Sequence, residues 1–477
     1  MMHPVYWYRL RRLGATAKLK RLRDLQWARA AEVEKLQQDR LSHLLRHAHA
    51  HVPYYRDVLE QCSAVDPAGR VDLSAFTAIP LLDKDLIRGR GDELLSDDLD
   101  QRPWFRNYSG GSTGEPVAFV QEKGETSYWG RAVTILYDEW SGRRPGDRCA
   151  LLWGSERDLA GKPSLRARYH RHTRRILVLN AFGMTPDRMG AYVEALNAFR
   201  PQQLLAYAGS LYELARYVHD TGLRVYSPAG VMTSAESIYP EQRALIESVF
   251  RAPVYDRYGS REAGNMACEC DHHRGLHVAA PTHLIELLRP DGALAGPGES
   301  GEIVVTCFET FAMPLVRYRI GDRATWAEGP CTCGRAWPLL QQVNGRVMDA
   351  FATPGGGTID GCYFTMGFFG RDWVEKFQVV QEAPDLLRVF IVLRDPATPR
   401  ERFEADIAHY DEHARTVLGP ACRVEYEFVD AITPSPQGKH RYTISKLATL
   451  DAELRCDPEE VADGARSERS PRPASPS

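Results

Sequence analysis

Residues 107–119 read N-Y-S-G-G-S-T-G-E-P-V-A-F, and this stretch says more about the fold than any other part of the chain. Its three glycines allow a tight backbone that can approach a ligand closely. The serine and threonine between them add hydroxyl groups beside exposed backbone amides, a combination that binds phosphate oxygens. Many turns rich in glycine and serine look similar, so the loop alone leaves phosphate binding and a plain surface turn both open. The common ATP loop is excluded, because Glu115 stands where that loop requires lysine.

Size and composition are those of an ordinary soluble globular protein. The chain has 477 residues, enough for two or more domains, with 43% hydrophobic and 26% charged residues. A formal net charge of -3 argues against nucleic acid as a partner. No apolar run approaches the ~20 residues of a membrane span, and the N-terminus lacks the apolar core of a signal peptide. Ten cysteines are too few for a disulfide scaffold, so we expect a cytoplasmic enzyme.

Residues 6–29 are strongly basic, with eight arginines and lysines against a single acid, Asp24. Leucines and alanines recur there at near-helical spacing, which predicts an amphipathic basic helix. With the aromatic residues at positions 6–8, such a helix could rest on an anionic membrane surface. A solvated basic face is the alternative. We treat residues 1–45 as a basic helical segment.

Strand-like and helix-like segments alternate over residues 46–345. The predicted strands are 148–153, 176–179, 203–207, 230–233 and 253–255, and the predicted helices are 188–199, 212–220 and 240–250. This alternation predicts an α/β domain with mixed, largely parallel sheets. Residues 300–306 and 314–320 read as strands joined by turns, which predicts a small antiparallel subdomain.

The pattern changes after residue 345. A short α+β pattern over residues 346–456 predicts a small C-terminal domain, with strands at 377–381, 387–393 and 423–428 and a helix at 402–417. Residues 457–477 end in R-S-P-R-P-A-S-P-S and have no apolar periodicity, so we predict a disordered tail.

Two acidic motifs follow the glycine-rich loop. Residues 255–262 read Y-D-R-Y-G-S-R-E, and the carboxylate of Glu262 is a suitable ligand for Mg²⁺ bound to phosphate. Residues 318–322 read Y-R-I-G-D, and Asp322 after a glycine turn suits a ribose diol. Taken alone, each acid is equally compatible with a surface turn.

Two basic motifs lie further along the chain. A glycine–arginine pair ends at Arg346, beside the predicted domain boundary, where it could contact nucleotide phosphate or ribose. Lys439 lies in T-P-S-P-Q-G-K-H-R at 433–441, a stretch rich in proline and glycine. Such a lysine is a compact cation that can reach an oxyanion, although singly it is a surface residue.

In this order the five motifs resemble the signature of adenylate-forming enzymes, the superfamily of acyl-CoA synthetases and related ligases. The likeness is strongest to the phenylacetate–CoA ligase branch and its relatives in capsule biosynthesis. Supporting stretches are L-L-R-H-A-H-A-H-V-P-Y-Y at 44–55, I-P-L-L-D-K-D-L-I-R at 79–88, T-S-A-E at 233–236, M-P-L-V-R-Y-R-I-G-D at 313–322, F-Q-V-V-Q at 377–381 and G-K-H-R-Y-T-I-S-K at 438–446. The resemblance implies a large N-terminal adenylate-forming domain and a small, mobile C-terminal lid domain.

The resemblance also implies roles for individual residues. The ATP phosphates would be bound by Ser109, Gly110, Gly111, Ser112, Thr113 and Gly114. The adenine side of the site would be formed by Ser234, Ala235, Glu236, Asp256, Arg257, Tyr258 and Gly259. Glu262 would bind Mg²⁺, and Asp322 would bind the ribose hydroxyls. Arg346 would contact the ribose or a phosphate, and Lys439 would bind the reacting oxygens. The family's acidic or lysine hinge position is occupied by Met348, with Asp349 next, which leaves the hinge residue open.

The implied reaction joins two anions. A carboxylate attacks the α-phosphate of ATP, which gives an acyl-adenylate and pyrophosphate, and coenzyme A then takes the acyl group through its thiol. Mg²⁺ on Glu262 and the cation of Lys439 would offset the repulsion, at a few kcal/mol for each preorganised group. One alternative keeps the adenylation but uses a carrier-protein thiol, an amine or a sugar as acceptor, in secondary-metabolite or capsule and surface-polymer biosynthesis. Another is a non-catalytic nucleotide-binding scaffold, which predicts loss of Lys439 or Glu262, and both are present.

The identity of the carboxylic acid is not readable. Relatives build the acyl pocket in regions that here contain Tyr137, Trp140, Asn180, Phe182, Tyr207 and Gly209. Their aromatic content would suit a planar or aromatic acid. Aromatic residues in α/β domains are more often part of the core, so that alternative stays open.

Cysteines and histidines indicate a metal site. Cys270 and His273 form a C-x2-H pair, and Cys331 and Cys333 lie on a turn rich in proline and glycine. Three thiolates and one imidazole complete a closed tetrahedral Zn²⁺ site of the structural kind. The ligands could instead include Cys268, His272 or His277, and free buried cysteines beside a solvated histidine are the alternative.

Overall fold

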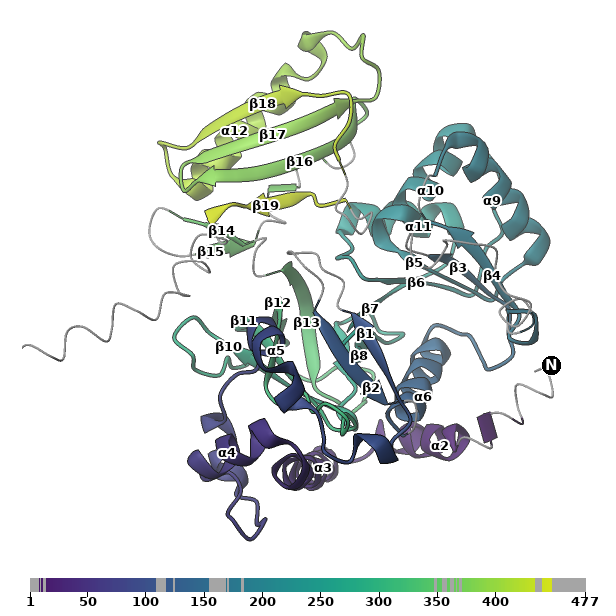
Figure 1. Ribbon diagram of the computed structural model, residues 1–477. Helices are drawn as coiled ribbons and strands as arrows, with labels where there is room; N and C mark the ends of the chain where they lie inside the picture. Colours follow the sequence, from purple (N-terminus) through teal and green to yellow (C-terminus); the bar gives the residue numbers. More distant parts are fainter. Residues whose placement is uncertain are drawn as a thin grey trace, which may run out of the picture. The chain divides into compact units, whose positions relative to one another are not determined.

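The computed structural model describes residues 8, 10–11, 14–108, 117–122, 125–153, 169, 171–181, 184–346, 350–353, 358–360, 364–365, 367–368, 371–433 and 440–447. The chain divides into two compact units, with a boundary between Gly345 and Arg346. Both contain helices and strands (Figure 1), so the predicted α/β class is confirmed. Among the residues described, no helix is both long and apolar enough to cross a membrane.

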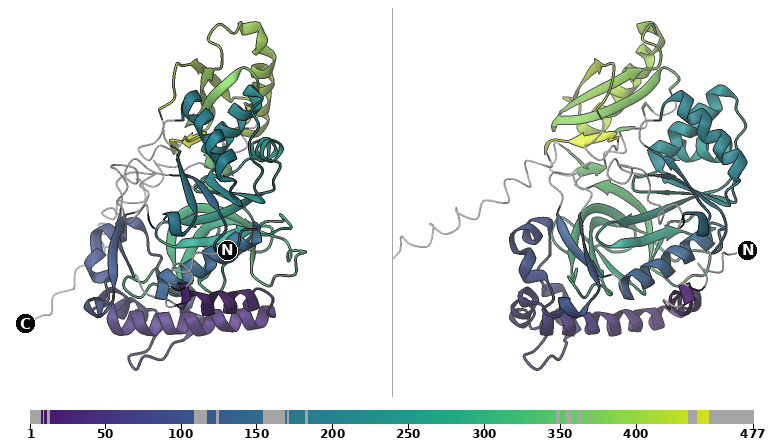
Figure 2. Two further views of the ribbon diagram at one scale, coloured as in Figure 1. Left: turned by 90° about the vertical axis from the view of Figure 1, so that its right-hand side faces the viewer. Right: turned by 45° about the vertical axis from the view of Figure 1, so that its right-hand side comes forward.

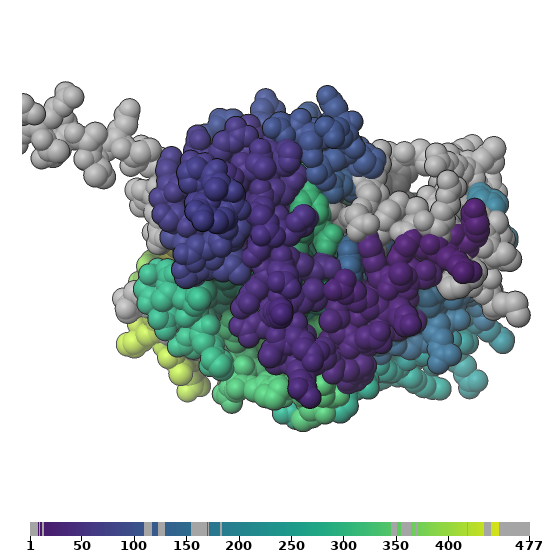
Figure 3. Space-filling view, turned by 90° about the horizontal axis from the view of Figure 1, so that it is seen from below, coloured from purple at the N-terminus to yellow at the C-terminus, as the bar shows by residue number. Residues whose placement is uncertain are grey.

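Helices α2 (Ala15–Leu25) and α3 (Ala30–His51) begin the larger unit and run along one side of it (Figures 1 and 2). Their atoms spread over the face seen in Figure 3. The apolar side of α2 packs on α6 (Glu125–Trp140), which leaves only its basic side for a membrane surface. Helix α3 runs without a break through the boundary expected at residue 45 and ends at His51.

Short elements lead from these helices to the sheet. They are α4 (Pro53–Gln61), η1 (Leu73–Ala78), α5 (Lys84–Arg90), η2 (Gly91–Leu94) and η3 (Leu99–Gln101). Strands β1 (Trp104–Tyr108) and β2 (Ala118–Glu122) then pair antiparallel, on either side of the glycine-rich loop in the sequence. Residues 109–116 of that loop lie outside the described part of the chain.

Parallel strands form one half of an 11-stranded sheet, in the order β7-β6-β5-β3-β4. They are β3 (Cys149–Trp153), β4 (Ile176–Asn180), β5 (Gln203–Tyr207), β6 (Gly230–Ser234) and β7 (Val254–Ser260). Helices α9 (Pro186–Phe199), α10 (Ala208–Thr221) and α11 (Pro240–Phe250) connect them and share their apolar core. Buried parallel strands are uniformly apolar, which is why the sequence predicts this half well.

Antiparallel strands continue the same sheet, in the order β10-β11-β12-β13-β9-β8 next to β7. They are β8 (Gly264–Glu269), β9 (Leu276–Val278), β10 (His283–Leu288), β11 (Ser300–Cys307), β12 (Tyr318–Trp326) and β13 (Leu339–Arg346). The strand predicted at 314–320 is displaced, since β12 starts only at Tyr318. Arg317 before it has a φ of 49°, and its buried guanidinium binds Glu286 and the carbonyl of Ile79, so the chain turns there instead of extending.

The smaller unit has an α+β arrangement. Its four-stranded sheet has the order β18-β17-β16-β19. The elements are β14 (Ala350–Ala352), β15 (Thr358–Asp360), β16 (Val374–Ala383), β17 (Leu386–Leu393), η6 (Arg400–Arg402), α12 (Glu404–Leu418), β18 (Arg423–Phe428) and β19 (Thr443–Ser445). The buried Gln381 side chain binds both the amide and the carbonyl of Ala352 at 2.8 and 2.7 Å, which holds β14 to this sheet.

Candidate active site and metal centre

The adjacent strands β6 and β7 carry predicted nucleotide residues to the same edge of the sheet. Because the two strands are parallel, their carboxyl ends meet there, where ligands of open α/β sheets usually bind. The hydroxyl of Thr233 donates to Oδ1 of Asp256 at 3.2 Å, which joins the two motifs directly. Beyond β6, Ala235 has a φ of 72°, and Glu236 accepts a hydrogen bond at 2.8 Å from the amide of Gly209, in the first turn of α10.

Strand β12 brings a second predicted acid to the end of β7. The hydroxyl of Tyr258 donates to Oδ2 of Asp322 at 2.7 Å. Gly321, with a φ of 85°, gives the left-handed backbone that a side chain would disfavour at this point of β12. The aromatic ring and the carboxylate, which are 64 residues apart in the sequence, therefore lie side by side and are both half-buried.

Glu262 lies just after β7 and is 8% exposed. Its Oε1 is 3.5 Å from the hydroxyl of Tyr318 at the start of β12. From β2, the side chain of Gln121 donates to the main-chain carbonyls of Arg261 and Glu262 at 2.9 and 3.2 Å. The strand that follows the glycine-rich loop is thus attached to the segment carrying the predicted Mg²⁺ ligand. The sequence gives no role to either residue: Gln121 lies in an otherwise ordinary strand, and Tyr318 belongs to the Y-R-I-G-D motif, in which only Asp322 is assigned a contact.

Several predicted site residues lie outside the described part of the chain. They are Ser109, Gly110, Gly111, Ser112, Thr113, Gly114, Phe182, Met348, Asp349 and Lys439. Arg346 ends strand β13. The described part of the predicted ATP site therefore consists of the ends of β6 and β7 with Glu262 and Asp322.

The residues suggested for an acyl pocket fall into two separate groups. Tyr137 is fully buried, with its hydroxyl bonded to the carbonyls of Met266 and His277, both at 3.3 Å. Trp140 packs in the same core. Tyr137 and Trp140 are thus core residues, and their burial argues against a place in an acyl pocket. Asn180, Tyr207 and Gly209 lie instead at the ends of β4 and β5 and the start of α10.

A cluster of three cysteines and one histidine is brought together by distant segments. The ligand atoms of Cys270, His277, Cys331 and Cys333 all lie within 4.8 Å of one another. Cys270 directly follows β8, His277 lies in β9, and the last two lie on the turn between β12 and β13. We refer to these four residues as the Cys/His cluster.

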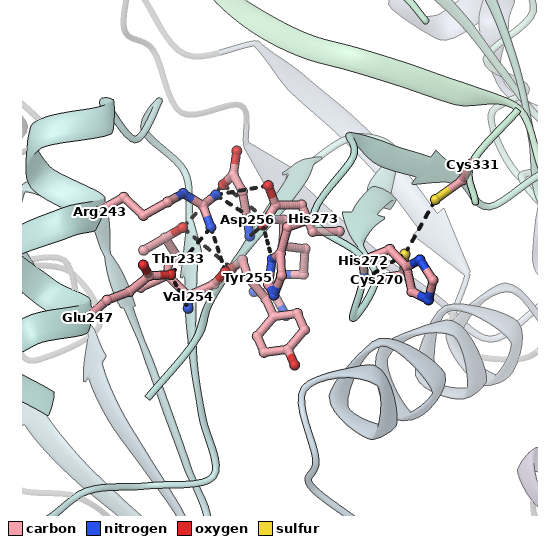
Figure 4. A network of polar contacts seen from close by, with 12 residues as sticks. Thr233, Arg243, Glu247, Val254, Tyr255, Asp256, Cys270, His272, His273 and Cys331 are labelled. Atoms are coloured by element: carbon pink, nitrogen blue, oxygen red, sulfur yellow. Dashed lines mark hydrogen bonds and ion pairs between the residues drawn. The ribbon is translucent and has the colours of Figure 1, made fainter. Parts of the chain in front are cut away.

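The expected ligand His273 is not part of this cluster. Its ring packs on Tyr255 with a centroid distance of 4.8 Å, and its Nδ1 lies 3.4 Å from Glu269 (Figure 4). His277, one of the alternatives, takes its place because β8 and β9 pair with Cys268 opposite His277. The C-x2-H spacing could not reveal this choice, since it depends on how two strands align.

The geometry of the Cys/His cluster fits a tetrahedral Zn²⁺ ion. Tetrahedral coordination with Zn–S bonds near 2.3 Å places two sulfurs about 3.8 Å apart, and Cys270 Sγ lies 3.8 Å from Cys331 Sγ. Cys333 Sγ and His277 Nε2 are 3.4 Å apart. His277 Nδ1 lies 3.3 Å from the carbonyl of Trp337, a contact that leaves Nε2 facing the sulfurs.

The electrostatics of the cluster agree with a buried ligand set. Burial lowers the pKa of His277 to about 4, so its imidazole is neutral at pH 7 and can act as a ligand. Burial raises the pKa of the Cys270 thiol to about 12. A bound dication would reverse that shift, because it stabilises the thiolate. Backbone amides of His272 and Arg335 donate to the sulfurs of Cys270 and Cys333, both at 3.4 Å.

The same turn also attaches helix α2. Arg335 Nε donates at 3.0 Å to the side-chain oxygen of Gln26, which also accepts a hydrogen bond from Trp140. The guanidinium lies between the rings of Trp27 and Trp140, at 4.8 and 4.6 Å from their centroids. The amide of Ala336 donates to the carbonyl of Gln26 at 2.9 Å. The basic N-terminal helix is therefore anchored on the segment that carries two of the cysteines.

A groove of about 1040 Å³ lies elsewhere in the larger unit, between α2, α3 and the segment before β1. Arg40 and Trp129 line it, with the guanidinium 4.3 Å from the ring centroid. It contains none of the predicted site residues, so it is not part of the candidate active site.

Comparison with known proteins agrees with this architecture. A family model of the CapK C-terminal domain matches residues 351–446. The chain is 23% identical to protein CapK of Staphylococcus aureus over 437 residues, which cover 90% of this chain and 92% of the relative. It is 25% identical to phenylacetate-coenzyme A ligase of Thermus thermophilus over 328 residues, 67% of this chain and 71% of the relative.

Among solved structures, 2-hydroxyisobutyryl-CoA ligase in the postadenylation state, in complex with R3-HIB-AMP, superposes with a TM-score of 0.71. The two chains are 20% identical, and the match covers 91% of this chain and 94% of the other. The homologues are thus CapK and phenylacetate–CoA ligases, and the fold is that of adenylate-forming ligases. The resemblance predicted from the motifs is confirmed, both for the superfamily and for its branch.

Proposed function

We propose that this protein activates a carboxylic acid with ATP, forming an acyl-adenylate and pyrophosphate, and then transfers the acyl group to the thiol of coenzyme A. The observation that carries the proposal is the meeting of three separate motifs at one sheet edge. Thr233 bonds to Asp256, and Tyr258 bonds to Asp322, at 3.2 and 2.7 Å. The resemblance assigns these motifs to the adenine and ribose of ATP, and the relatives named as CoA ligases support the thiol acceptor.

In the first step, a carboxylate oxygen of the acid forms a bond to the α-phosphorus while the bond to pyrophosphate breaks. Asp322 would accept hydrogen bonds from the ribose hydroxyls and so fix the α-phosphate relative to the acid. Mg²⁺, held by Glu262 and phosphate oxygens, would supply positive charge against the repulsion of the two anions. The cation of Lys439 would stabilise the same oxygens, a type of contact that is worth a few kcal/mol.

In the second step, the thiolate of coenzyme A forms a bond to the acyl carbon and AMP leaves with the bonding electron pair. The similarity to CapK, which extends over 90% of this chain, supports an alternative in which the acceptor is a carrier-protein thiol, an amine or a sugar. The two alternatives share the adenylation step and differ only in the nucleophile. Product formation with free coenzyme A separates them, whereas exchange of pyrophosphate into ATP does not.

The decisive experiment is pyrophosphate release by the full-length protein with ATP, Mg²⁺ and a broad panel of carboxylic acids. We expect at least one acid to give release, and Lys439→Ala to abolish it while ATP still binds. Lys446→Ala is the matched control, because Lys446 is an exposed lysine of the smaller unit bound to Glu382 at 2.6 Å. If no acid gave release, the adenylation would be refuted in favour of a nucleotide-binding scaffold. Unchanged release by Lys439→Ala would remove that residue from the mechanism.

We further propose that the Cys/His cluster holds a structural Zn²⁺ ion. Its four protein ligands would leave no open coordination position, so the ion would stabilise the fold and take no part in the reaction. The proposal is supported by the sulfur spacing of 3.8 Å and by the neutral, buried His277. Elemental analysis of the purified protein should find about one zinc per chain, and its absence after purification without chelators would refute the assignment.

A further inference from the structure

The beginning of strand β7 is held by side chains on the side where no strand pairs with it. Pairing with β8 begins only at Arg257, opposite Cys268. Before that point, the amide of Val254 donates to Glu247 at 3.0 Å, and the carbonyl of Val254 accepts from Arg243 at 2.6 Å. The amide of Asp256 donates at 2.9 Å to Oε2 of Glu269 (Figure 4). Glu269, the last residue of β8, therefore contacts β7 through its side chain, one residue past the point where the backbone pairing of the two strands stops.

The Glu269 carboxylate is itself firmly held. Arg243 donates to both of its oxygens, at 2.8 and 3.0 Å, and the residue is 7% exposed. The carboxylate is thus fixed between α11, β7 and the end of β8.

Glu269 is covalently next to Cys270, a member of the Cys/His cluster. The turn that follows contacts β7 a second time, through the ring of His273 on the ring of Tyr255. Cys270 and the amide of Asp256 are therefore connected through a single residue, Glu269. Figure 4 shows the sulfur atoms of Cys270 and Cys331 to one side of His273, Tyr255 and Asp256.

We propose that Glu269 is a positioning residue that ties strand β7, and with it the nucleotide residues Asp256–Gly259, to the Cys/His cluster. The part that concerns the nucleotide rests on the proposed function. The physical basis is a buried carboxylate with four hydrogen-bond contacts, whose loss takes the acceptor from the amide of Asp256 and one of its partners from Arg243. Since β7 carries Tyr258 at its other end, a looser beginning also displaces the hydroxyl that binds Asp322.

The first test is hydrogen–deuterium exchange of the full-length protein over residues 254–258, with Glu269→Ala and Glu269→Gln. Glu269→Ala should speed exchange there at least about tenfold, because the acceptor of the Asp256 amide is gone. Glu269→Gln keeps one acceptor oxygen and should rescue most of the protection. Unchanged exchange in both variants would overturn the proposal.

The matched control is Glu286→Gln. Glu286 forms a second buried ion pair in the same sheet, with Arg317 at 3.1 Å, and the two residues are 7% and 6% exposed. It lies on β10, away from β7. If Glu286→Gln, Glu269→Gln and Glu269→Ala all raise exchange over 254–258 equally, the effect is general destabilisation and the assignment to Glu269 is wrong.

The link to the cluster is tested by removing the metal. Chelation of the wild-type protein should speed exchange over 254–258, and adding Zn²⁺ should reverse it. In Glu269→Ala, chelation should add little, because two changes in one network are not additive. Fully additive effects, or a wild-type protein that exchanges equally with and without chelator, would overturn the link.

The effect of Glu269 on ATP binding is measured through the steady-state kinetics of pyrophosphate release. Glu269→Ala should raise KM for ATP about tenfold and change kcat less than threefold, whereas Glu286→Gln should leave KM unchanged. If the wild-type protein releases pyrophosphate but Glu269→Ala has an unaltered KM, the positioning of the nucleotide residues is refuted. If the wild-type protein releases none with any acid, the proposed function fails, and the exchange data alone decide whether Glu269 positions β7.

Discussion

Strand β7 begins and ends in two very different polar environments. At its beginning, Val254 is bonded to the half-buried side chains of Arg243 and Glu247, and Asp256 to the buried Glu269, beside the Cys/His cluster proposed to hold Zn²⁺. At its end, Tyr258 and Asp322 bond to one another while both stay half-buried, so part of each remains accessible to solvent. The first environment is completed by the protein itself, and the second keeps polar atoms within reach of a ligand.

The two ends of this seven-residue strand are therefore expected to contribute differently, the first to the stability of the fold and the second to ligand binding. Charged groups that are buried and fully partnered fix a structure, and removing one partner is costly. Partly exposed polar groups at the carboxyl ends of strands lie where ligands of open α/β sheets bind. We therefore expect substitutions at the beginning of β7 to lower stability and to affect ATP binding only by loosening the strand, and those at its end to affect ATP binding and pyrophosphate release with little loss of stability.

The largest effect is expected at the Cys/His cluster. Cys331→Ala removes one of the four proposed metal ligands, and the free energy of unfolding should fall by about 4 kcal/mol, the range typical of a lost metal. Denaturant unfolding and zinc analysis of the same samples measure it. Cys307→Ala is the control, a buried cysteine outside the cluster, and it should cost about 1 kcal/mol. Equal losses for the two variants would contradict a structural metal.

The next largest effect is expected just past the end of β7. Glu262→Gln removes the charge proposed to bind Mg²⁺, and pyrophosphate release should fall about 100-fold, or roughly 2.7 kcal/mol. The thermal unfolding midpoint should stay close to that of the wild type. Glu302→Gln, in a partly buried ion pair with Arg319, should release pyrophosphate at the normal rate. A Glu262→Gln enzyme with an unchanged rate and Mg²⁺ dependence would exclude this carboxylate as the ligand.

The sequence predicts the parallel half of the sheet and the end of β7 because both are encoded locally. Buried parallel strands are continuous apolar runs, and helices α9 and α11 each begin with a proline. The motif residues lie directly after such strands, so their meeting at one edge follows from strand direction. The pairing of Tyr258 with Asp322 does not follow, since it depends on β12 entering the sheet from 64 residues away.

The cluster and its surroundings could be predicted only in part. Three cysteines were identified from spacing, but the choice of His277 over His273 depends on the register of β8 and β9. Tyr137 and Trp140 look like pocket residues in sequence, yet they are covered by the core that includes helix α2. Glu269 gives no motif at all. The positions of these residues depend on contacts between segments that are distant in the sequence, and periodicity and spacing contain no information about such contacts.

A smaller effect concerns the pH dependence of stability at Asp256. Burial of its carboxyl group, and then the nearby charge of Glu269, raise its pKa from 3.8 to about 7, against the opposing charge of Arg243. The native state therefore holds this proton more tightly than the unfolded chain does. The resulting stabilisation is complete below about pH 3.8 and is lost as the pH rises through 7.

Asp256→Asn has no such proton to lose. Its free energy of unfolding, relative to the wild type, should increase by about 1 kcal/mol between pH 6 and pH 7. Denaturant unfolding at the two pH values measures the difference. Asp57→Asn, a substitution on the exposed side of α4, should leave the pH profile unchanged. Parallel profiles for the wild type and Asp256→Asn would show that the carboxylate is already ionised in this range.

The smallest effect tests whether the end of β7 is specialised for a ligand. Tyr258→Phe removes one hydrogen bond to Asp322, worth about 1 kcal/mol, and water can replace part of it because Asp322 is half-buried. KM for ATP should rise about fivefold, with kcat and the unfolding midpoint almost unchanged. Tyr192→Phe is the control, since its hydroxyl bonds to the carbonyl of Asn180 at 2.9 Å, at the end of β4. If both variants shift KM alike, the end of β7 has no special role in binding ATP; if only Tyr258→Phe does, the hydroxyl acts by orienting the carboxylate proposed to bind the ribose.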